Sequence, residues 1–141
     1  MKPKWIKMYM DFAMRLSQES HAKRLKVGAV FVSPDGVVST GINGMPAGGS
    51  NECEQYDNGI YITKEEVSHA EENCYAKMLN QGVSAKGGTL FLTHSPCINC
   101  ARLIVNSGTS NVYYLNSYRC DNGIDFLLSR GVNVIKLKEI E

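Results

Sequence analysis

The spacing of apolar side chains divides the chain into helices and strands. From Lys4 to Glu19 they recur at helical spacing, which predicts a helix with one face in the core. The apolar positions of this stripe are Trp5, Met8, Tyr9, Phe12, Ala13 and Leu16. A continuous apolar run at 27–32 and a second apolar segment at 37–42 flank Pro34-Asp35-Gly36. This arrangement predicts a hairpin of two strands.

The second half of the chain alternates between helical and strand patterns. Helices are expected at 69–81, 97–106 and 122–130, and strands at 89–93, 111–115 and 132–137. Strands joined through helices favour parallel pairing, with helices covering both faces of the sheet. The predicted fold is therefore an α/β structure, a three-layer α/β/α sandwich with a five-stranded mixed sheet. Residues 1–141 are expected to form a single domain.

The segment from Asn43 to Ser68 shows little periodicity and is rich in glycine and asparagine. A loop of this length inside a compact domain is usually functional or disordered. It runs directly into His69, so we expect it to border a functional site as a lid or an effector-binding segment.

Composition and charge indicate which kinds of partner the protein is expected to have. Hydrophobic residues make up 43% of the chain, and the formal net charge is +1. No apolar run reaches the length of a membrane span and no signal-peptide core is visible, so a cytoplasmic protein without a membrane partner is expected. The near-neutral charge argues against a nucleic-acid partner, which would usually require a basic stripe. The five cysteines are expected to be reduced thiols or metal ligands.

The strongest candidates for a catalytic or metal-binding role are His69, Glu71, Cys97 and Cys100. One histidine and two cysteines can supply three zinc ligands and leave the fourth position open, as a catalytic zinc requires. Glu71 is not needed as a ligand, and a carboxylate beside the metal can shuttle protons. The sequence H-x-E followed by P-C-x-x-C is the signature of zinc-dependent nucleobase deaminases.

The spacing suits this chemistry. Cys97 and Cys100 are three residues apart and share one face of a helix, and Pro96 favours a helix start just before them. Two helix N-termini would then point at one metal ion. One alternative is two unrelated cysteines in a core, and another is a closed structural zinc site, which would need a fourth ligand. The candidates for that ligand are Cys53, Cys74, Cys120, His21 and His94. Neither alternative explains Glu71 or Pro96.

These motifs and several further segments resemble the cytidine deaminase superfamily and, within it, the deoxycytidylate deaminases. The matching segments are 20–29 (SHAKRLKVGA), 41–46 (GINGMP) with Gly48, 69–73 (HAEEN), 93–102 (THSPCINCAR), 112–114 and Tyr118. The resemblance implies hydrolysis of dCMP to dUMP and ammonia, which supplies dUMP for thymidylate synthesis. It also implies one catalytic Zn²⁺ per chain, held by His69, Cys97 and Cys100, with Glu71 as the proton shuttle.

The resemblance assigns further residues to the nucleotide. Asn43 would hold the deoxyribose, Arg24 with Lys23 the phosphate, and Tyr118 would line the pocket, with Ala70 and Ser95 as further substrate contacts. Family members are often homohexamers activated by dCTP and inhibited by dTTP, which implies the same effectors and assembly here. The implied effector residues are Gly44, Pro46, Gly48, Gly49 and Asn51. A triphosphate effector could bring Mg²⁺ with it.

Two other functions stay open at this point. The same zinc chemistry could act on dCTP or on another cytosine or nucleobase substrate, including free cytidine, tRNA adenosine, guanine and single-stranded nucleic acid. A non-catalytic nucleotide-binding module could also use this fold. Glu71 discriminates between enzyme and module, because a zinc-stabilised scaffold has no use for a carboxylate beside the metal.

Overall fold

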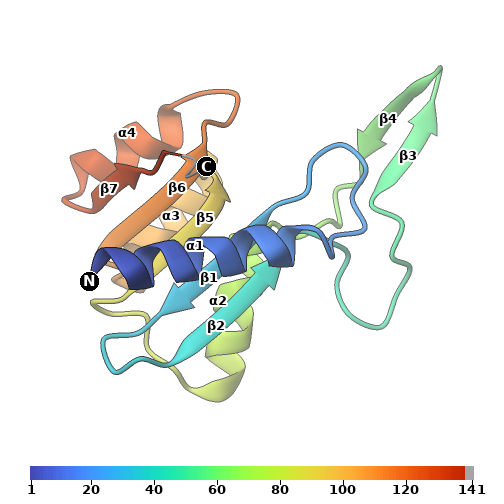
Figure 1. The fold of residues 1–141 in the computed structure, drawn as a ribbon. Coiled ribbons are helices and arrows are strands. Elements are labelled where there is room, and N and C mark those ends of the chain that lie inside the picture. The colour runs from blue at the N-terminus through green and yellow to red at the C-terminus, as the bar shows by residue number, and fades with distance from the viewer. Residues whose placement is uncertain (139–141) are drawn as a thin grey trace.

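A computed structural model describes residues 1–138 of the chain. Its main sheet has five strands, and a separate hairpin projects away from it (Figure 1). The elements in order are α1 (Pro3–Ser17), β1 (Gly28–Val32), β2 (Val38–Ile42), β3 (Glu54–Asp57), β4 (Ile60–Thr63), α2 (Ala70–Gln81), β5 (Thr89–His94), α3 (Ile98–Ser107), β6 (Asn111–Asn116), α4 (Asn122–Ser129) and β7 (Asn133–Lys136).

The main sheet is mixed, as the sequence predicted. Its strand order is β2-β1-β5-β6-β7. β1 pairs antiparallel with both β2 and β5, whereas β5, β6 and β7 are parallel. The antiparallel half contains the predicted hairpin, and the parallel half contains the strands that helices connect. The predicted five-stranded α/β fold is therefore confirmed.

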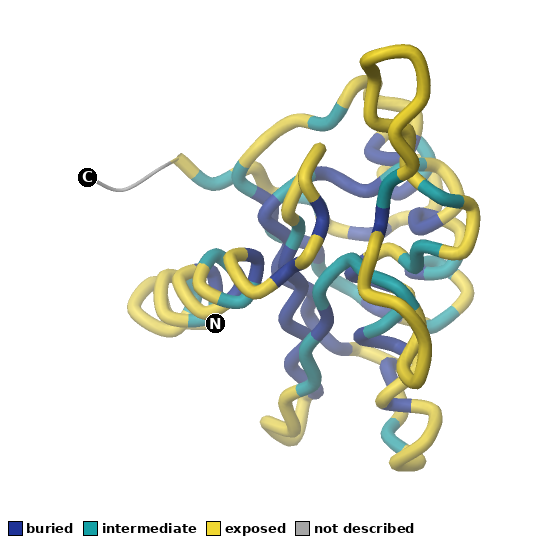
Figure 2. Tube along the Cα trace, turned by 90° about the vertical axis from the view of Figure 1, so that its right-hand side faces the viewer, coloured by how far each residue is buried: buried dark blue, intermediate teal, exposed yellow. Residues whose placement is uncertain are grey.

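Helices cover the two faces of the sheet unequally. α2, α3 and α4 pack together on one face, where Phe31, Leu90, Leu92 and Val112 of the strands are fully buried. α1 packs on the opposite face, against Val30 and the other residues of a smaller apolar cluster. Figure 2 shows the buried segments concentrated in the middle of the molecule and exposed segments around them.

The apolar stripe of α1 is only partly buried. Ala13 is buried and Tyr9 and Leu16 pack against the smaller cluster, but Trp5, Met8 and Phe12 are 44%, 43% and 41% exposed. The prediction that the whole stripe lies in the core is wrong for these three residues. α1 is the helix that packs on this face of the sheet, and its contact with the strands covers only part of its apolar stripe. The rest of the stripe therefore stays exposed.

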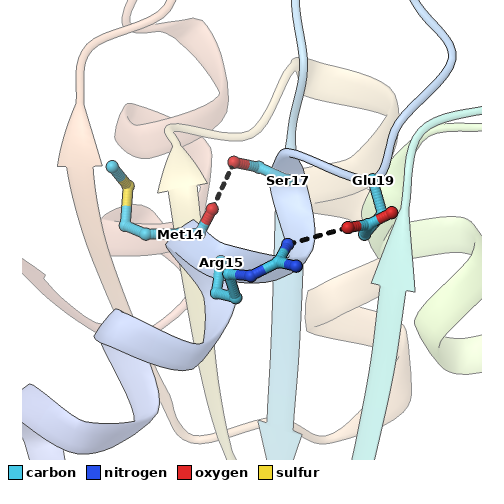
Figure 3. A network of polar contacts seen from close by, with 4 residues as sticks. All are labelled: Met14, Arg15, Ser17 and Glu19. Atoms are coloured by element: carbon cyan, nitrogen blue, oxygen red, sulfur yellow. Dashed lines mark hydrogen bonds and ion pairs between the residues drawn. The ribbon is translucent and has the colours of Figure 1, made fainter.

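The C-terminal end of α1 leads into the segment that carries the predicted phosphate residues. The Ser17 hydroxyl donates a hydrogen bond to the carbonyl of Met14 (2.6 Å), and Arg15 forms an ion pair with Glu19 (2.8 Å; Figure 3). The helix ends at Ser17, two residues before the predicted end. A serine hydroxyl that bonds back to the preceding turn competes with helix continuation.

The 43–68 segment, which was predicted to be a loop, contains a β-hairpin. β3 and β4 pair antiparallel, and the turn between them is Asn58-Gly59, with φ angles of 49° and 82°. Asn-Gly with two positive φ angles is the favoured two-residue hairpin turn. The strands are short and mostly exposed, so they lack the alternation that identifies a half-buried strand.

Within residues 1–138, no helix combines the length and apolar character needed to cross a membrane.

Candidate metal centre and active site

His69 occupies the N-cap position of α2, so its ring lies at the N-terminal end of that helix. The Glu72 carboxylate accepts a hydrogen bond from the backbone amide of His69 (2.8 Å). This interaction closes the first turn of the helix in the manner of a capping box. The start of α2 therefore has a fixed position.

The first turn of α2 lies directly on β2. A Cβ atom added at Gly41 would lie 2.1 Å from the carbonyl oxygen of Ala70, so only glycine permits this approach. One turn further along, the Asn73 amide donates a hydrogen bond to the carbonyl of Ile42 (2.7 Å). These contacts fix the helix that carries His69 and Glu71 relative to the sheet.

The two cysteines lie at the start of α3. Cys97 is the N-cap, and Cys100 is in the first turn and 1% exposed. α4 supports this segment closely, because a Cβ at Gly123 would lie 2.1 Å from the carbonyl oxygen of Pro96. As predicted from the spacing, the N-termini of α2 and α3 lie at the same place, where their dipoles favour negative charge.

The structure brings the three predicted ligands together. The candidate ligand atoms of His69, Cys97 and Cys100 all lie within 4.8 Å of one another. The Nδ1 atom of His69 is 3.3 Å from Sγ of Cys100 and 3.5 Å from Sγ of Cys97. In a tetrahedral zinc site with ordinary Zn–N and Zn–S bonds, such atoms are about 3.6 Å apart. The donor set and its spacing therefore fit a zinc ion.

The electrostatics prepare one of the two sulfur atoms for a metal ion, because the pKa of the Cys97 thiol is lowered, whereas the hydrogen bond with Cys97 and burial raise the pKa of the Cys100 thiol. Hydrogen bonds, first from Cys100 and then from His69, lower the pKa of Cys97 to about 3, so this residue is a thiolate at neutral pH. The hydrogen bond to Cys97 raises the pKa of His69 to about 9. Zinc binds thiolates and neutral imidazole, so binding would release one proton from His69 and one from Cys100.

Glu71 lies beside these ligands and is buried, with 4% exposure. Burial raises the pKa of its carboxyl group to about 7, because the charged form loses solvation. A group with this pKa exchanges protons readily at neutral pH, which suits a general acid–base catalyst.

A cavity of about 640 Å³ opens over the cluster. Arg24, Asn43, Ala70, Ser95 and Tyr118, all predicted as substrate contacts, line it together with His69, Glu71 and Cys97. The cavity is therefore large enough for a small ligand, and it combines the candidate metal centre with polar groups on its walls.

Two of these wall residues also have supporting roles. The Asn43 side chain accepts a hydrogen bond from the Val27 amide (2.8 Å) and donates one to the Leu25 carbonyl (2.7 Å). The Ser95 hydroxyl accepts a hydrogen bond from the backbone amide of Tyr118 (2.6 Å). Asn43 thus fixes the segment after Arg24, and Ser95 fixes the backbone position of Tyr118.

Comparison with known proteins places this geometry in a family. Residues 3–116 match the family described as the cytidine and deoxycytidylate deaminase zinc-binding region. This chain belongs to that deaminase family. The matched region contains all three candidate ligands and Glu71, so the predicted relationship to zinc-binding deaminases is confirmed.

Individual relatives agree with this assignment. The crystal structure of dCMP deaminase from the cyanophage S-TIM5, in complex with dCMP and dUMP, superposes with a TM-score of 0.90. It is 42% identical, and the match covers 97% of this chain and 99% of that one. The deoxycytidylate deaminase of Saccharomyces cerevisiae is 32% identical over 95% of this chain and 45% of its own length. The ComE operon protein 2 of Bacillus subtilis is 32% identical over 82% of this chain and 61% of its own length. The deaminase chain thus spans less than two thirds of these two curated relatives.

Some predicted residues lie away from the cavity over the candidate metal centre. Lys23 lines a second cavity, and its ammonium nitrogen is 4.8 Å from the centroid of the Tyr61 ring. Asn51 also lines that second cavity. Lys23 and Arg24 therefore line different cavities, although the two residues are adjacent in the sequence.

Residues outside the predicted substrate contacts also line the cavity. His94 and Asn116 end the neighbouring parallel strands β5 and β6 and face each other in register. Ligands of α/β proteins bind at such carboxyl ends, so this signal was available from the strand pattern. Glu54 and Thr63 also line the cavity, but their position depends on the β3–β4 hairpin, which the sequence pattern did not predict.

Proposed function

We propose that this chain catalyses the hydrolytic deamination of dCMP to dUMP and ammonia, and so supplies dUMP for thymidylate synthesis. The observation that carries the proposal is the buried Glu71 carboxyl group beside three converging candidate zinc ligands, two of which, His69 and Cys97, line the same cavity as Glu71. The 42% identical S-TIM5 structure contains dCMP and dUMP and supports this choice of substrate.

The residues of the chain would share the chemistry as follows. Zinc, held by His69, Cys97 and Cys100, would act as a Lewis acid that makes water a better nucleophile at neutral pH. Glu71 would accept a proton as water adds to C4 of the cytosine ring and deliver a proton to N3. It would then accept the proton of the hydroxyl group added at C4 and transfer it to the amino group, which leaves as ammonia when the C4–N bond breaks and the C4 carbonyl forms. The buried carboxyl group suits both transfers, because its pKa of about 7 lets it accept and donate.

The cavity walls provide groups for the rest of the nucleotide. Asn43 would contact the deoxyribose and Tyr118 would pack along the pocket, with Ala70 and Ser95 close to the base. Arg24 would bind the phosphate, because a guanidinium group can donate two hydrogen bonds to phosphate oxygens.

Regulation by dCTP and dTTP is part of the proposal. The glycine-rich stretch with Gly44, Pro46, Gly48, Gly49 and Asn51 would bind the effector, and Mg²⁺ could accompany the triphosphate. Asn51 supports this idea, because it lines the second cavity, of about 630 Å³, together with three basic side chains and with the acidic Glu52 and Glu54. These basic residues are His21, Lys23 and Lys64.

The assembly would be a homohexamer in the cytoplasm. The exposed apolar side chains of Trp5, Met8 and Phe12 on α1 support burial of this face between copies of the chain.

A substrate panel tests the activity. Zinc-loaded protein would be incubated with deoxycytidine, dCMP, dCTP, CMP and a short deoxycytidine-containing oligonucleotide, and ammonia release followed for each. Turnover of dCMP well above the others is expected. Preferred turnover of dCTP, the nucleoside or the oligonucleotide would change the proposed substrate but leave the proposed zinc chemistry in place. Zinc-loaded protein that is inactive on all five compounds would favour a nucleotide-binding module.

A dCMP saturation curve unaffected by dCTP and dTTP would contradict the proposed regulation.

A further inference from the structure

The segment that carries Arg24 lies outside the helices and strands. Residues at the base of the β3–β4 hairpin form hydrogen bonds with it. Oε2 of Glu54 accepts hydrogen bonds from the backbone amides of Lys23 (2.8 Å) and Arg24 (3.1 Å). Two amide donors that converge on one carboxylate oxygen fix the backbone at this point, because each bond is charge-assisted.

The opposite strand of the hairpin holds the Arg24 side chain. The hydroxyl oxygen of Thr63 accepts a hydrogen bond from Nη1 of Arg24 (3.1 Å). Glu54 and Thr63 are directly paired residues in the hairpin register. A single cross-strand pair therefore contacts both the backbone and the guanidinium group of Arg24.

This pair belongs to the cavity that contains the catalytic carboxyl group. Arg24, Glu54 and Thr63 line that cavity together with His69 and Glu71. The hairpin base is itself anchored, since the Lys64 amide donates to the Cys53 carbonyl (2.8 Å).

A second anchor lies just before His69. Gly44 and Ser68 exchange a pair of backbone hydrogen bonds of 3.0 and 2.9 Å. These backbone hydrogen bonds hold the base of the hairpin at the edge of the site, although its far end projects away from the main sheet (Figure 1).

We propose that Glu54 and Thr63 are positioning residues that hold the Arg24 guanidinium group where it meets the phosphate of the nucleotide. The inference rests on the proposed function and deepens it. An exposed arginine on an irregular loop would otherwise lose much conformational freedom when it binds an anion. The contacts with Glu54 and Thr63 impose part of that order before the nucleotide arrives. The negative charge of Glu54 does not prevent this role, because its carboxylate is engaged by two amides.

The test separates the phosphate from the rest of the substrate. Values of kcat and KM would be measured with dCMP and with deoxycytidine, which has the same base and sugar but no phosphate. For Glu54→Ala and Thr63→Val we expect kcat/KM for dCMP to fall about tenfold, mainly through KM, as for one or two lost hydrogen bonds. The value for deoxycytidine should stay within about twofold. Where deoxycytidine reacts too slowly, the Kd values of dUMP and deoxyuridine give the same comparison.

Conservative variants and a neighbouring residue provide the controls. Glu54→Gln and Thr63→Ser keep an acceptor oxygen, so they should retain most of the activity with dCMP. Asp57→Asn changes another acidic residue of the same hairpin, at the far end of β3, and should behave like the unmodified chain. Melting temperature and zinc content would confirm that every variant is folded and loaded.

Three results would overturn the inference. An equal loss with dCMP and deoxycytidine would mean that the pair supports the whole site rather than the phosphate contact. Unchanged kinetics in both Glu54→Ala and Thr63→Val would remove any role. A lower KM for dCMP in Glu54→Ala would show that the carboxylate competes with phosphate for the two amides. Failure of the proposed function is distinct, since the unmodified chain would then not turn over dCMP.

Discussion

At the scale of single residues, Glu71 distinguishes an enzyme from a zinc-stabilised scaffold. Replacing it with glutamine keeps the shape and the hydrogen-bonding oxygen but removes the ability to accept a proton. We expect Glu71→Gln to lower kcat for dCMP by about 10²- to 10⁴-fold, the usual range for loss of a general acid–base group. Its zinc content, measured by elemental analysis, should stay near one per chain.

Glu65 provides a matched control for this change. It is an exposed glutamate in the turn that precedes α2. Glu65→Gln makes the same chemical substitution outside the cavity and should leave kcat unchanged. If Glu71→Gln turned over dCMP like the unmodified chain, another group would have to move the proton.

Metal removal should change the reactivity of the cysteines as well as the activity. Cys120 is exposed, whereas burial raises the pKa of the Cys74 thiol to about 11, and Cys53 is only 2% exposed. In the zinc-loaded protein, a thiol reagent should therefore react rapidly with Cys120 alone. After chelation, Cys97 should join it, because its low pKa keeps it as a thiolate.

The same experiment has a stability readout. Zinc binds the folded chain, so chelation should lower the melting temperature, and added zinc should restore both stability and turnover. Cys120→Ser identifies the rapid thiol. An unchanged thiol count and melting temperature after the zinc is removed would argue that Cys97 is not a ligand.

At the scale of secondary-structure elements, the site depends on close contact between β2 and α2. We expect Gly41→Ala to lower the melting temperature by about 4–10 °C and to reduce kcat, because the added Cβ would lie 2.1 Å from the Ala70 oxygen. The displacement would move the turn that carries His69 and Glu71. Thermal unfolding and steady-state kinetics measure the two effects.

Gly44→Ala is the stability control for this substitution. Within the described residues, an added Cβ at Gly44 meets no heavy atom within 4 Å, and the Gly44 backbone φ angle is not positive. Its melting temperature should stay close to that of the unmodified chain. Equal stability of both variants would mean that α2 can shift without cost.

The elements also show why the sequence could place the three candidate zinc ligands together but could not predict the contacts of Arg24. His69 and Cys97 both precede helices, and each motif carries its own start signal, so local pattern was sufficient. Arg24 instead depends on Glu54 and Thr63, 30 and 39 residues away, across a hairpin with no hydrophobic alternation. The Asn58-Gly59 turn was the available signal for that hairpin. Periodicity likewise could not show which part of the α1 stripe meets the sheet, because that depends on which strands α1 lies across.

At the scale of the whole molecule, the two faces of the sheet are covered unequally. Three helices pack together on one face, whereas α1 packs on the other and leaves its own apolar side chains partly in solvent. Trp5, Met8 and Phe12 are spaced three and four residues apart, so they form one stripe along the helix. An exposed stripe of this kind is unfavourable in an isolated domain and typical of a surface that another chain covers.

Phe12→Glu tests whether this stripe joins copies of the chain. The side chain is 41% exposed, so a charge there should leave the folded monomer intact, since Met10 and Ala13 remain in the core. In an apolar interface the same charge would be buried without a partner, which is strongly unfavourable. We therefore expect light scattering after size-exclusion chromatography to show a hexamer for the unmodified chain and a smaller species for Phe12→Glu. Leu79→Glu, at an 82% exposed position on α2, makes an equivalent change elsewhere and should preserve the hexamer. A hexamer that survives Phe12→Glu would place the interface on another surface, and a monomeric unmodified chain would rule out the proposed assembly.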